Sequence, residues 1–231
     1  MVQVNNTKIT LRFKFRKTGR LKYISHLDLV RTMHKVIVRS DLPLWYTEGF
    51  NPKPKMAFAA PLSIGTDSYC EFLDLRLSEM MDPAEAMARI NKNLTDDMQI
   101  VEAYYPETKF TDLKWFSYTV LIKTSGASKA LAQECERALS AERIEILKKT
   151  KSGEAIVDIR PMIRSASVVI DSDALRMNAV LSADPSAFLN PEHVITVLKR
   201  ECGILSSGDL LSEYYSIVRE NAYDAEMNPF R

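Results

Sequence analysis

Strict alternation of side-chain type runs through residues 8–16, whose sequence is KITLRFKFR. The apolar members are Ile9, Leu11, Phe13 and Phe15, and the positions between them carry Lys8, Thr10, Arg12, Lys14 and Arg16. Because successive side chains of a β-strand point to opposite faces, the pattern predicts a strand with one buried face and one strongly basic face.

An amphipathic helix is predicted after a turn at residues 18–20. Ser25 and Asp28 have the spacing of a capping box, so Ser25 is the expected N-cap. The helix is expected to end near Ser40, ahead of Pro43. Its apolar stripe is predicted to consist of Leu27, Val30, Met33 and Ile37.

A stiff extended loop is predicted at residues 49–55, because Pro52 and Pro54 stand one residue apart. The elements expected after it are a strand at 69–77, a helix from Asp82 to about Asn93 and a strand at 99–105. A short strand is also expected between the first helix and the proline loop. The order strand, helix, strand, strand, helix, strand favours a ferredoxin-like α+β sandwich, in which two helices cover one face of an antiparallel sheet.

The pattern partly recurs after residue 112. The expected elements are strands at 115–123, 143–149, 155–163, 166–170, 175–181 and 211–219, with helices at 127–139 and 191–202. We therefore predict two ferredoxin-like (βαββαβ) domains, at 1–107 and 112–220, the second with an extra hairpin. Residues 106–112 are the expected linker, and residues 221–231 are expected to form a mobile tail.

Positive charge is concentrated near the N-terminus, although the formal net charge is only +1. Residues 8–60 contain 12 Lys or Arg and three acids, a net charge of +9, whereas the rest of the chain carries −8. Local fields of this kind recruit polyanions, but basic clusters also occur on surfaces that have no such partner. Tyr23, Trp45, Tyr46 and Phe50 lie among the basic residues, and this mixture suits single-stranded RNA. Trp45 and Phe50 are nevertheless expected to belong to the core.

The candidate site residues follow from this distribution. We predict that RNA is bound by Arg12, Arg16, Arg20, Lys22, Tyr23, Arg31, Lys35, Lys53, Lys55 and Arg160. His26 is the candidate catalytic residue, because a helix N-terminus disfavours a charged imidazole and a neutral one can act as a general base. Packing of His26 on the edge of the sheet is the simpler alternative. His34 is expected at the core boundary, and Asp158 is expected to pair with Arg160, which could instead extend the basic surface.

Several function classes are not supported by the sequence. Cys70, Cys135 and Cys202 are more than 60 residues apart, so neither a disulfide framework nor a metal or iron–sulfur cluster is expected, and the three are interpreted as small buried residues. Neither glycine-rich nucleotide-binding motif occurs. No cofactor is therefore expected. No run of about 18 apolar residues is present, and the first ten residues lack a signal sequence, so we expect a cytoplasmic protein without membrane contact.

Three blocks of the sequence resemble a known family. Residues 13–29 (FKFRKTGRLKYISHLDL), 46–65 (YTEGFNPKPKMAFAAPLSIG) and 158–164 (DIRPMIR) are similar to the radical SAM-linked protein family, whose genes lie beside or are fused to a radical SAM enzyme gene. The resemblance implies a partnership with such an enzyme. This chain lacks the three-cysteine cluster motif of that enzyme, so it is not expected to be the enzyme itself. Its basic face then fits a substrate-presenting role on tRNA or ribosomal RNA.

Three functions remain open at this point. The first is an RNA-binding accessory protein, whose N-terminal domain binds RNA and whose C-terminal domain contacts a partner enzyme. The second is a metal-independent endoribonuclease, because paired ferredoxin-like domains with a histidine near the first helix resemble the CRISPR repeat-processing nucleases. In that case His26 deprotonates a 2′-hydroxyl, but the glycine-rich loop of those nucleases is absent. The third is a protein–protein adaptor whose basic face meets an acidic partner.

Overall fold

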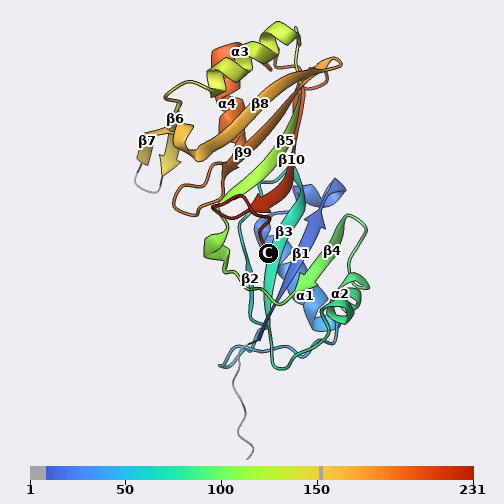
Figure 1. Ribbon diagram of the computed structural model, residues 1–231. Coiled ribbons are helices and arrows are strands. Elements are labelled where there is room, and N and C mark those ends of the chain that lie inside the picture. Colours follow the sequence, from blue (N-terminus) through green and yellow to red (C-terminus); the bar gives the residue numbers. More distant parts are fainter. Residues whose placement is uncertain (1–8, 151–152) are drawn as a thin grey trace, which may run out of the picture. The chain divides into compact units, whose positions relative to one another are not determined.

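The computed structural model describes residues 9–150 and 153–231, so Lys8 of the predicted basic strand face lies outside the described chain. It consists of two compact units. The first ends at Asp112 and also includes Arg231, and the second comprises Leu113–Phe230. Antiparallel strands and four α-helices make up the two units (Figure 1), so the predicted α+β class is confirmed. No described helix has the length and apolar character that crossing a membrane requires.

The first unit has the element order predicted for it. Its elements are β1 (Ile9–Lys17), α1 (His26–Arg39), β2 (Met56–Phe58), β3 (Thr66–Leu77), α2 (Pro83–Asn91) and β4 (Met98–Tyr104). The strands are antiparallel, and their order in the sheet is β4-β1-β3-β2. The position of the short strand is a correction: it follows the proline loop as β2 instead of preceding it. Pro52 and Pro54 have no N–H to donate, so ladder pairing with β3 begins only at Met56.

The core of the first unit lies between the sheet and its helices. Leu11, Phe13 and Phe15 of β1 are completely buried, which confirms the predicted apolar face. They belong to one cluster with side chains of α1, α2, β3 and β4, so both helices cover the same face of the sheet. The predicted cap is also confirmed, because Ser25 Oγ accepts a hydrogen bond from the Asp28 N–H at 3.1 Å.

Helix α1 turns a different stripe toward this core than the sequence predicts. The buried stripe consists of Leu29, Met33, Val36 and Ile37. Leu27, predicted to be part of it, is 56% exposed, and Val30 is only half-buried. The apolar residues of α1 therefore cover a wider arc than the sheet can bury, and the arc at Leu27 and Val30 lies outside the core.

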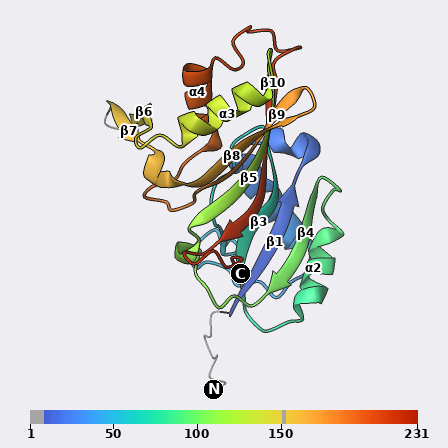
Figure 2. The ribbon, with the colours of Figure 1, turned by 45° about the horizontal axis from the view of Figure 1, so that its top comes forward.

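The second unit repeats the strand order of the first around an additional hairpin. Its elements are β5 (Trp115–Lys123), α3 (Lys129–Leu139), β6 (Glu145–Thr150), β7 (Gly153–Asp158), β8 (Ile163–Asp171), β9 (Ala174–Ser182), α4 (Pro191–Cys202) and β10 (Tyr214–Tyr223). Its main sheet has the order β10-β5-β9-β8, and β6 and β7 form a separate two-stranded sheet. Helices α3 and α4 lie side by side (Figure 2).

The segment at 221–231 differs from the predicted mobile tail. β10 continues to Tyr223, three residues into the predicted tail. Phe230 beyond it is buried, and its N–H donates to the Ala222 carbonyl at 2.9 Å. Asp224 accepts hydrogen bonds from the backbone and side-chain amides of Asn228, which closes a turn between the two. A buried aromatic side chain and its backbone hydrogen bond to β10 therefore hold this segment in the fold.

Candidate functional site

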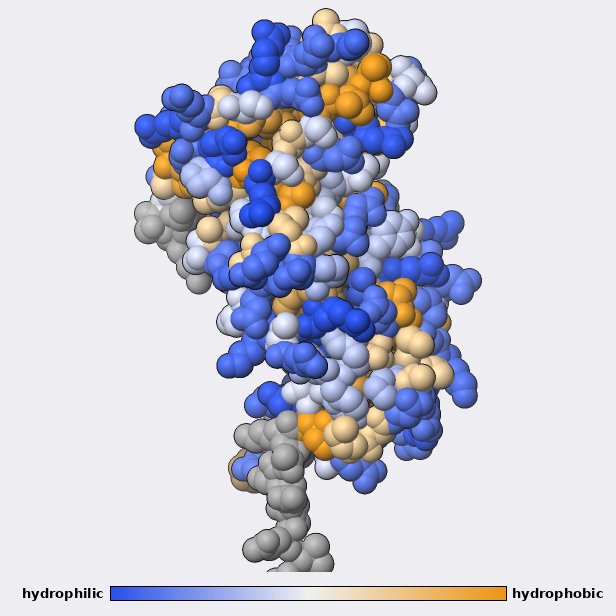
Figure 3. Space-filling model, in the orientation of Figure 1, coloured by the Kyte–Doolittle hydropathy of each residue, from blue (hydrophilic) through white to orange (hydrophobic). Residues whose placement is uncertain are grey.

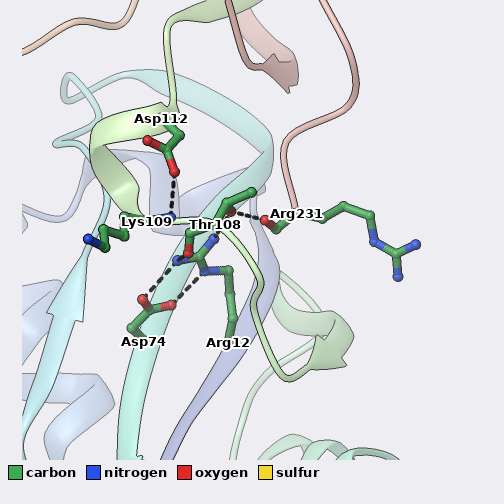
Figure 4. Close-up of polar contacts among 6 residues, drawn as sticks. All are labelled: Arg12, Asp74, Thr108, Lys109, Asp112 and Arg231. Atoms are coloured by element: carbon green, nitrogen blue, oxygen red, sulfur yellow. Dashed lines mark hydrogen bonds and ion pairs between the residues drawn. The ribbon is translucent and has the colours of Figure 1, made fainter.

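Arg12 was a predicted RNA contact, and its position in the fold corrects that prediction. Its guanidinium is buried on the outer face of β1, where it donates two hydrogen bonds to Asp74, at 2.7 and 2.9 Å (Figure 4). It also donates to Thr108 and lies 4.5 Å from the centre of the Phe110 ring. The residues after β4 thus cover Arg12, and a side chain that is 1% exposed is not available to a polyanion.

The other basic side chains of β1 are also engaged within the first unit. Lys14 pairs with Glu102 of β4 at 3.1 Å, and the guanidinium of Arg16 donates to the Asp96 carbonyl at 3.0 Å. The outer face of β1 is basic in sequence, but neighbouring strands supply acids to Arg12 and Lys14, and a loop supplies a backbone carbonyl to Arg16. It is therefore a paired surface, contrary to the free basic face that alternation predicts.

The turn after β1 contains three of the predicted RNA contacts, Arg20, Lys22 and Tyr23, and two of them are accessible. Arg20 and Tyr23 are exposed. Lys22 pairs with Asp67 at 3.0 Å, and its ammonium lies 5.5 Å from the centre of the Tyr23 ring. Acids also fix the backbone here, because the N–H of Arg20 donates to Asp97. Arg20 and Tyr23 remain accessible, whereas Lys22 is already neutralised.

Exposed apolar side chains are by themselves weak markers of a site. On the face drawn in Figure 3, hydrophilic side chains predominate and hydrophobic ones form small separate groups. Such scattered residues are ordinary on protein surfaces. A stronger candidate needs apolar and charged side chains that share one concavity.

One concavity of the first unit meets that condition. A groove of about 490 Å³ lies between α1 and the segment at 53–56. We call it the α1 groove, and its lining residues are Leu27, Val30, Arg31, His34, Lys35, Lys53, Pro54 and Met56. It brings together three predicted RNA contacts, from segments that are separate in the sequence. The sequence missed its apolar members, because Leu27 and Val30 were assigned to the core; the remaining signal was Arg31 and Lys35 directly beside that stripe.

The loop that forms one wall of the α1 groove is held in place by the backbone. Thr47 and Lys53 exchange two hydrogen bonds, one from each N–H, at 2.9 and 3.1 Å. The N–H of Lys55 donates to the Trp45 carbonyl, and the Lys55 carbonyl accepts from Arg76 of β3. The two sides of the loop are therefore hydrogen-bonded to each other and to the sheet, and these bonds fix the backbone position of Lys53.

The aromatic residues of this loop differ in their exposure. Phe50 at its tip is fully exposed, so its predicted place in the core is wrong. Trp45 is half-buried, and the ammonium of Lys55 lies 5.5 Å from the centre of its ring. Tyr46 is exposed, and its backbone forms an isolated antiparallel β-bridge with that of Pro54. Lys55 thus has an aromatic partner, whereas Lys53 lines the groove.

Charge in the α1 groove is positive. Arg31 forms an exposed ion pair with Asp28, which lies one turn earlier in the same helix, at 3.5 Å. Lys35 and Lys53 are exposed, and neither forms an ion pair within the described residues. All eight lining residues are apolar, basic or histidine. The local field of the groove therefore favours an anionic ligand.

The two histidines of α1 have different surroundings. His26 is exposed at the first position of the helix, and its ring packs edge-on against Phe58 at 5.7 Å. That contact corresponds to the simpler interpretation of His26, packing at the sheet. His34 is half-buried and lines the α1 groove, and its Nε2 is buried with no hydrogen-bond partner within the described chain.

Arg160, another predicted RNA contact, belongs to the second unit and does not line the α1 groove. Its hydrogen bonds are local and structural. Its guanidinium donates to the Ile163 carbonyl at 2.8 Å, and its N–H donates to Asp158 at 3.0 Å. Hydrogen bonds from the backbones of Ile144 and Arg160 lower the pKa of Asp158. The expected association of Asp158 with Arg160 thus runs through the backbone N–H, because Arg160 begins a 3₁₀ turn instead of continuing β7.

The second unit also contains interacting groups that the sequence did not bring together. Burial raises the pKa of Cys135 to about 12, and its thiol hydrogen-bonds to that of Cys202, although the two are 67 positions apart in the chain. Hydrogen bonds from Ser207 and from the Ser125 N–H lower the pKa of Glu213 to about 2. Both arrangements are enclosed and structural. No cluster of three or more His, Cys, Asp or Glu suited to a metal ion occurs in the described part of the chain.

The fold and the groove define an α+β protein of two units with one cationic, partly apolar groove on the first. The chain belongs to a family described as "Uncharacterized protein conserved in bacteria (DUF2344)", whose profile matches residues 10–191. No curated protein matches its sequence.

Two solved structures are similar to the chain at low identity. A chain of a Cbf5-Nop10-Gar1 complex has a TM-score of 0.49 and 9% identity, over 91% of this chain and 49% of that one. This chain thus spans about half the length of that relative. An unknown protein from Galdieria sulphuraria has a TM-score of 0.27 and 10% identity, over 92% of this chain and 98% of the other. Similarity at these scores carries no information on function.

Proposed function

We propose that this protein is a cytoplasmic RNA-binding accessory protein, which binds single-stranded RNA in the α1 groove and presents it to a partner radical SAM enzyme. The observation that carries RNA binding is the groove itself. Arg31 and Lys35 of α1, Lys53 of the loop and four apolar side chains line the same concavity. Cations on two walls attract phosphates, and apolar surface between them suits the faces of bases.

The proposal revises which basic residues bind RNA. Arg12 is excluded because it is buried and paired with Asp74, and Arg16 is not retained because its guanidinium donates to the Asp96 carbonyl. The contacts retained in the groove are Arg31, Lys35 and Lys53. Arg20 and Tyr23, which are exposed in the segment before α1, are also retained. Fewer contacts imply a modest affinity with a clear dependence on salt.

The partner enzyme and the fold family are also part of the proposal. Both units have the connectivity expected of ferredoxin-like sandwiches, with strand orders β4-β1-β3-β2 and β10-β5-β9-β8, and we assign both to that fold. The resemblance to radical SAM-linked proteins supports the partnership, and the second unit is assigned the contact with the enzyme. The RNA substrate is tRNA or ribosomal RNA.

The test is a titration of a labelled, unstructured RNA with the full chain across a salt series. The Lys35→Ala/Lys53→Ala variant removes two groove cations, and Lys92→Ala/Lys109→Ala removes two exposed lysines elsewhere on the first unit. Both variants lose the same net charge. The slope of log K against log salt changes by about 0.7 for each phosphate contact to a single strand, so a decrease of about 1.4 is expected for the groove variant alone.

Each other result contradicts the proposal in a distinct way. Equal slopes for both variants place RNA outside the groove. Absence of binding near physiological salt, together with co-purification of an enzyme, favours the protein–protein adaptor. Cleavage of the labelled RNA that is lost in His26→Ala favours the endoribonuclease.

A further inference from the structure

We infer that the α1 groove holds one unstacked nucleotide, with its base between the helix and the loop, and therefore discriminates single-stranded from double-stranded RNA. This inference rests on the proposed function and adds which part of the RNA the groove takes, a single nucleotide whose base is unstacked. It depends on four properties of the groove: its size, its apolar walls, the placement of its cations and the state of His34.

The size of the groove fits a single nucleotide. Its volume is about 490 Å³. Sites for small molecules measure roughly 300–1,000 Å³, so the groove has room for one base with its sugar. In an A-form duplex the bases are stacked and paired, and side chains cannot read its deep, narrow major groove. A base can enter this groove only when it is free of its partner.

Apolar groups on both walls can contact the two faces of a base. Leu27 and Val30 project from α1, and Pro54 and Met56 belong to the opposite segment. Leu27 is 56% exposed, whereas Leu29, Met33, Val36 and Ile37 of the same helix are buried. The flat faces of a base are its least polar surfaces, and they bury apolar area in such a slot with little dependence on sequence.

The cations lie where the phosphates of an extruded nucleotide would be. Arg31 and Lys35 are four residues apart, on one face of α1, and Lys53 stands on the loop. A strand that crosses the groove therefore meets cations on both walls. The helix wall alone would also bind a duplex backbone, but the apolar gap between the walls has no function in that case.

His34 supplies a polar group within this apolar slot. Its Nε2 is buried and has no hydrogen-bond partner within the described chain. Leaving a buried polar group unpaired is unfavourable, and such groups call for an explanation. The edge of a base carries both donors and acceptors, and a base in the groove would supply the missing partner after a small rotation of the imidazole. We assign His34 as the residue that distinguishes one base from another.

The experiment compares three ligands of equal length: a single-stranded RNA, its duplex and an abasic ribose-phosphate strand. Burial of one apolar group the size of a large side chain corresponds to a factor of about 10 to 150 in affinity. We expect the abasic strand to bind the wild-type protein more weakly than the RNA by a factor in this range, with the duplex also weaker than the single strand.

Variants separate the base from the phosphates. Leu27→Ala/Met56→Ala is expected to weaken RNA binding and leave the abasic strand unchanged. Lys35→Ala/Lys53→Ala weakens both. Leu210→Ala/Leu211→Ala, a matched truncation of exposed apolar residues on the second unit, changes neither. Because Met56 also touches the core, Leu27→Ala alone is measured as well, and a thermal melt checks the folding of each variant.

His34→Phe keeps a planar ring and removes the polar edge. It should reduce the difference in affinity among oligomers of adenine, cytosine and uracil, with the abasic strand unaffected. Equal binding of RNA, duplex and abasic strand, with the lysine variant still defective, overturns the single-nucleotide inference and leaves the proposed function intact. No effect of the lysine variant, or binding only of an acidic amphipathic peptide, overturns both.

Discussion

The guanidinium of Arg12 and the carboxylate of Asp74 face each other across β1 and β3 and form a two-pronged ion pair, at 2.7 and 2.9 Å. Arg12 is 1% exposed and Asp74 is 19% exposed. Thr108 and Phe110, which follow β4, complete the surroundings of the guanidinium. The pair thus attaches the end of the first unit to its sheet, and its residues are structural.

Removal of one partner is therefore expected to destabilise the protein strongly. Arg12→Ala leaves Asp74 without its partner, and breaking a buried pair in this way costs about 3–5 kcal/mol of unfolding free energy. Arg31→Ala is the control, because its pair with Asp28 is exposed and is worth at most about 1 kcal/mol. Urea denaturation measures both. Similar losses for the two variants would show that the Arg12 pair is not enclosed.

The sequence predicts the secondary structure of this chain correctly where residues close together in the sequence determine it. Ser25 and Asp28 define the start of α1 through contacts that span three residues. The predicted strand at 115–123 and the predicted helix at 191–202 coincide with β5 and α4. In these cases the side-chain period and the caps lie within the segment itself, so no distant residue has to be known.

The sequence predicts the site only in part, because the side chains that surround its residues lie far away in the sequence. The acids that neutralise the face of β1 include Asp74 and Glu102, more than 60 positions away. Alternation shows that Arg12 faces away from the core, but it cannot show what covers it. Likewise, the helical period predicts Leu27 as a member of the apolar stripe, and only the position of the sheet and the loop decides that it lines a groove.

Glu213 gives the stability of the second unit a dependence on pH. Its carboxylate is buried, and hydrogen bonds from Ser207 and from the Ser125 N–H lower its pKa to about 2. The ordinary pKa of a glutamate is about 4.3, so the stabilisation is complete above that pH and is lost as the pH falls toward 2.

The measurement is denaturation of wild type and Glu213→Gln between about pH 7 and pH 2. The variant is expected to be less stable at pH 7, and the difference should shrink below about pH 4.3. Glu226→Gln changes an exposed glutamate and serves as the control. A gap between wild type and Glu213→Gln that is constant with pH would mean that the carboxylate charge contributes nothing.

The thiol of Cys135 is predicted to be unreactive in the folded protein. Burial raises its pKa to about 12, so the nucleophilic thiolate is scarce at pH 8. Cys70 is also completely buried, whereas Cys202 is half-buried. Brief treatment with iodoacetamide should therefore modify Cys202 first, and all three cysteines only in denaturant. Peptide mass spectrometry reads the sites directly, and rapid labelling of native Cys135 would contradict its burial.

The last prediction concerns the segment that the sequence describes as a mobile tail. Phe230 is buried, its N–H bonds to Ala222, and the bridge between Tyr223 and Pro229 holds the turn before it. Phe230→Ala should therefore cost about 3–5 kcal/mol, as for other buried phenylalanines. Leu211→Ala truncates a side chain that is 92% exposed and should stay within about 0.5 kcal/mol of wild type. If the two variants unfold at the same denaturant concentration, the aromatic anchor is absent in solution and the tail is mobile. A large loss confined to Phe230→Ala establishes instead that the chain is ordered and packed as far as this residue.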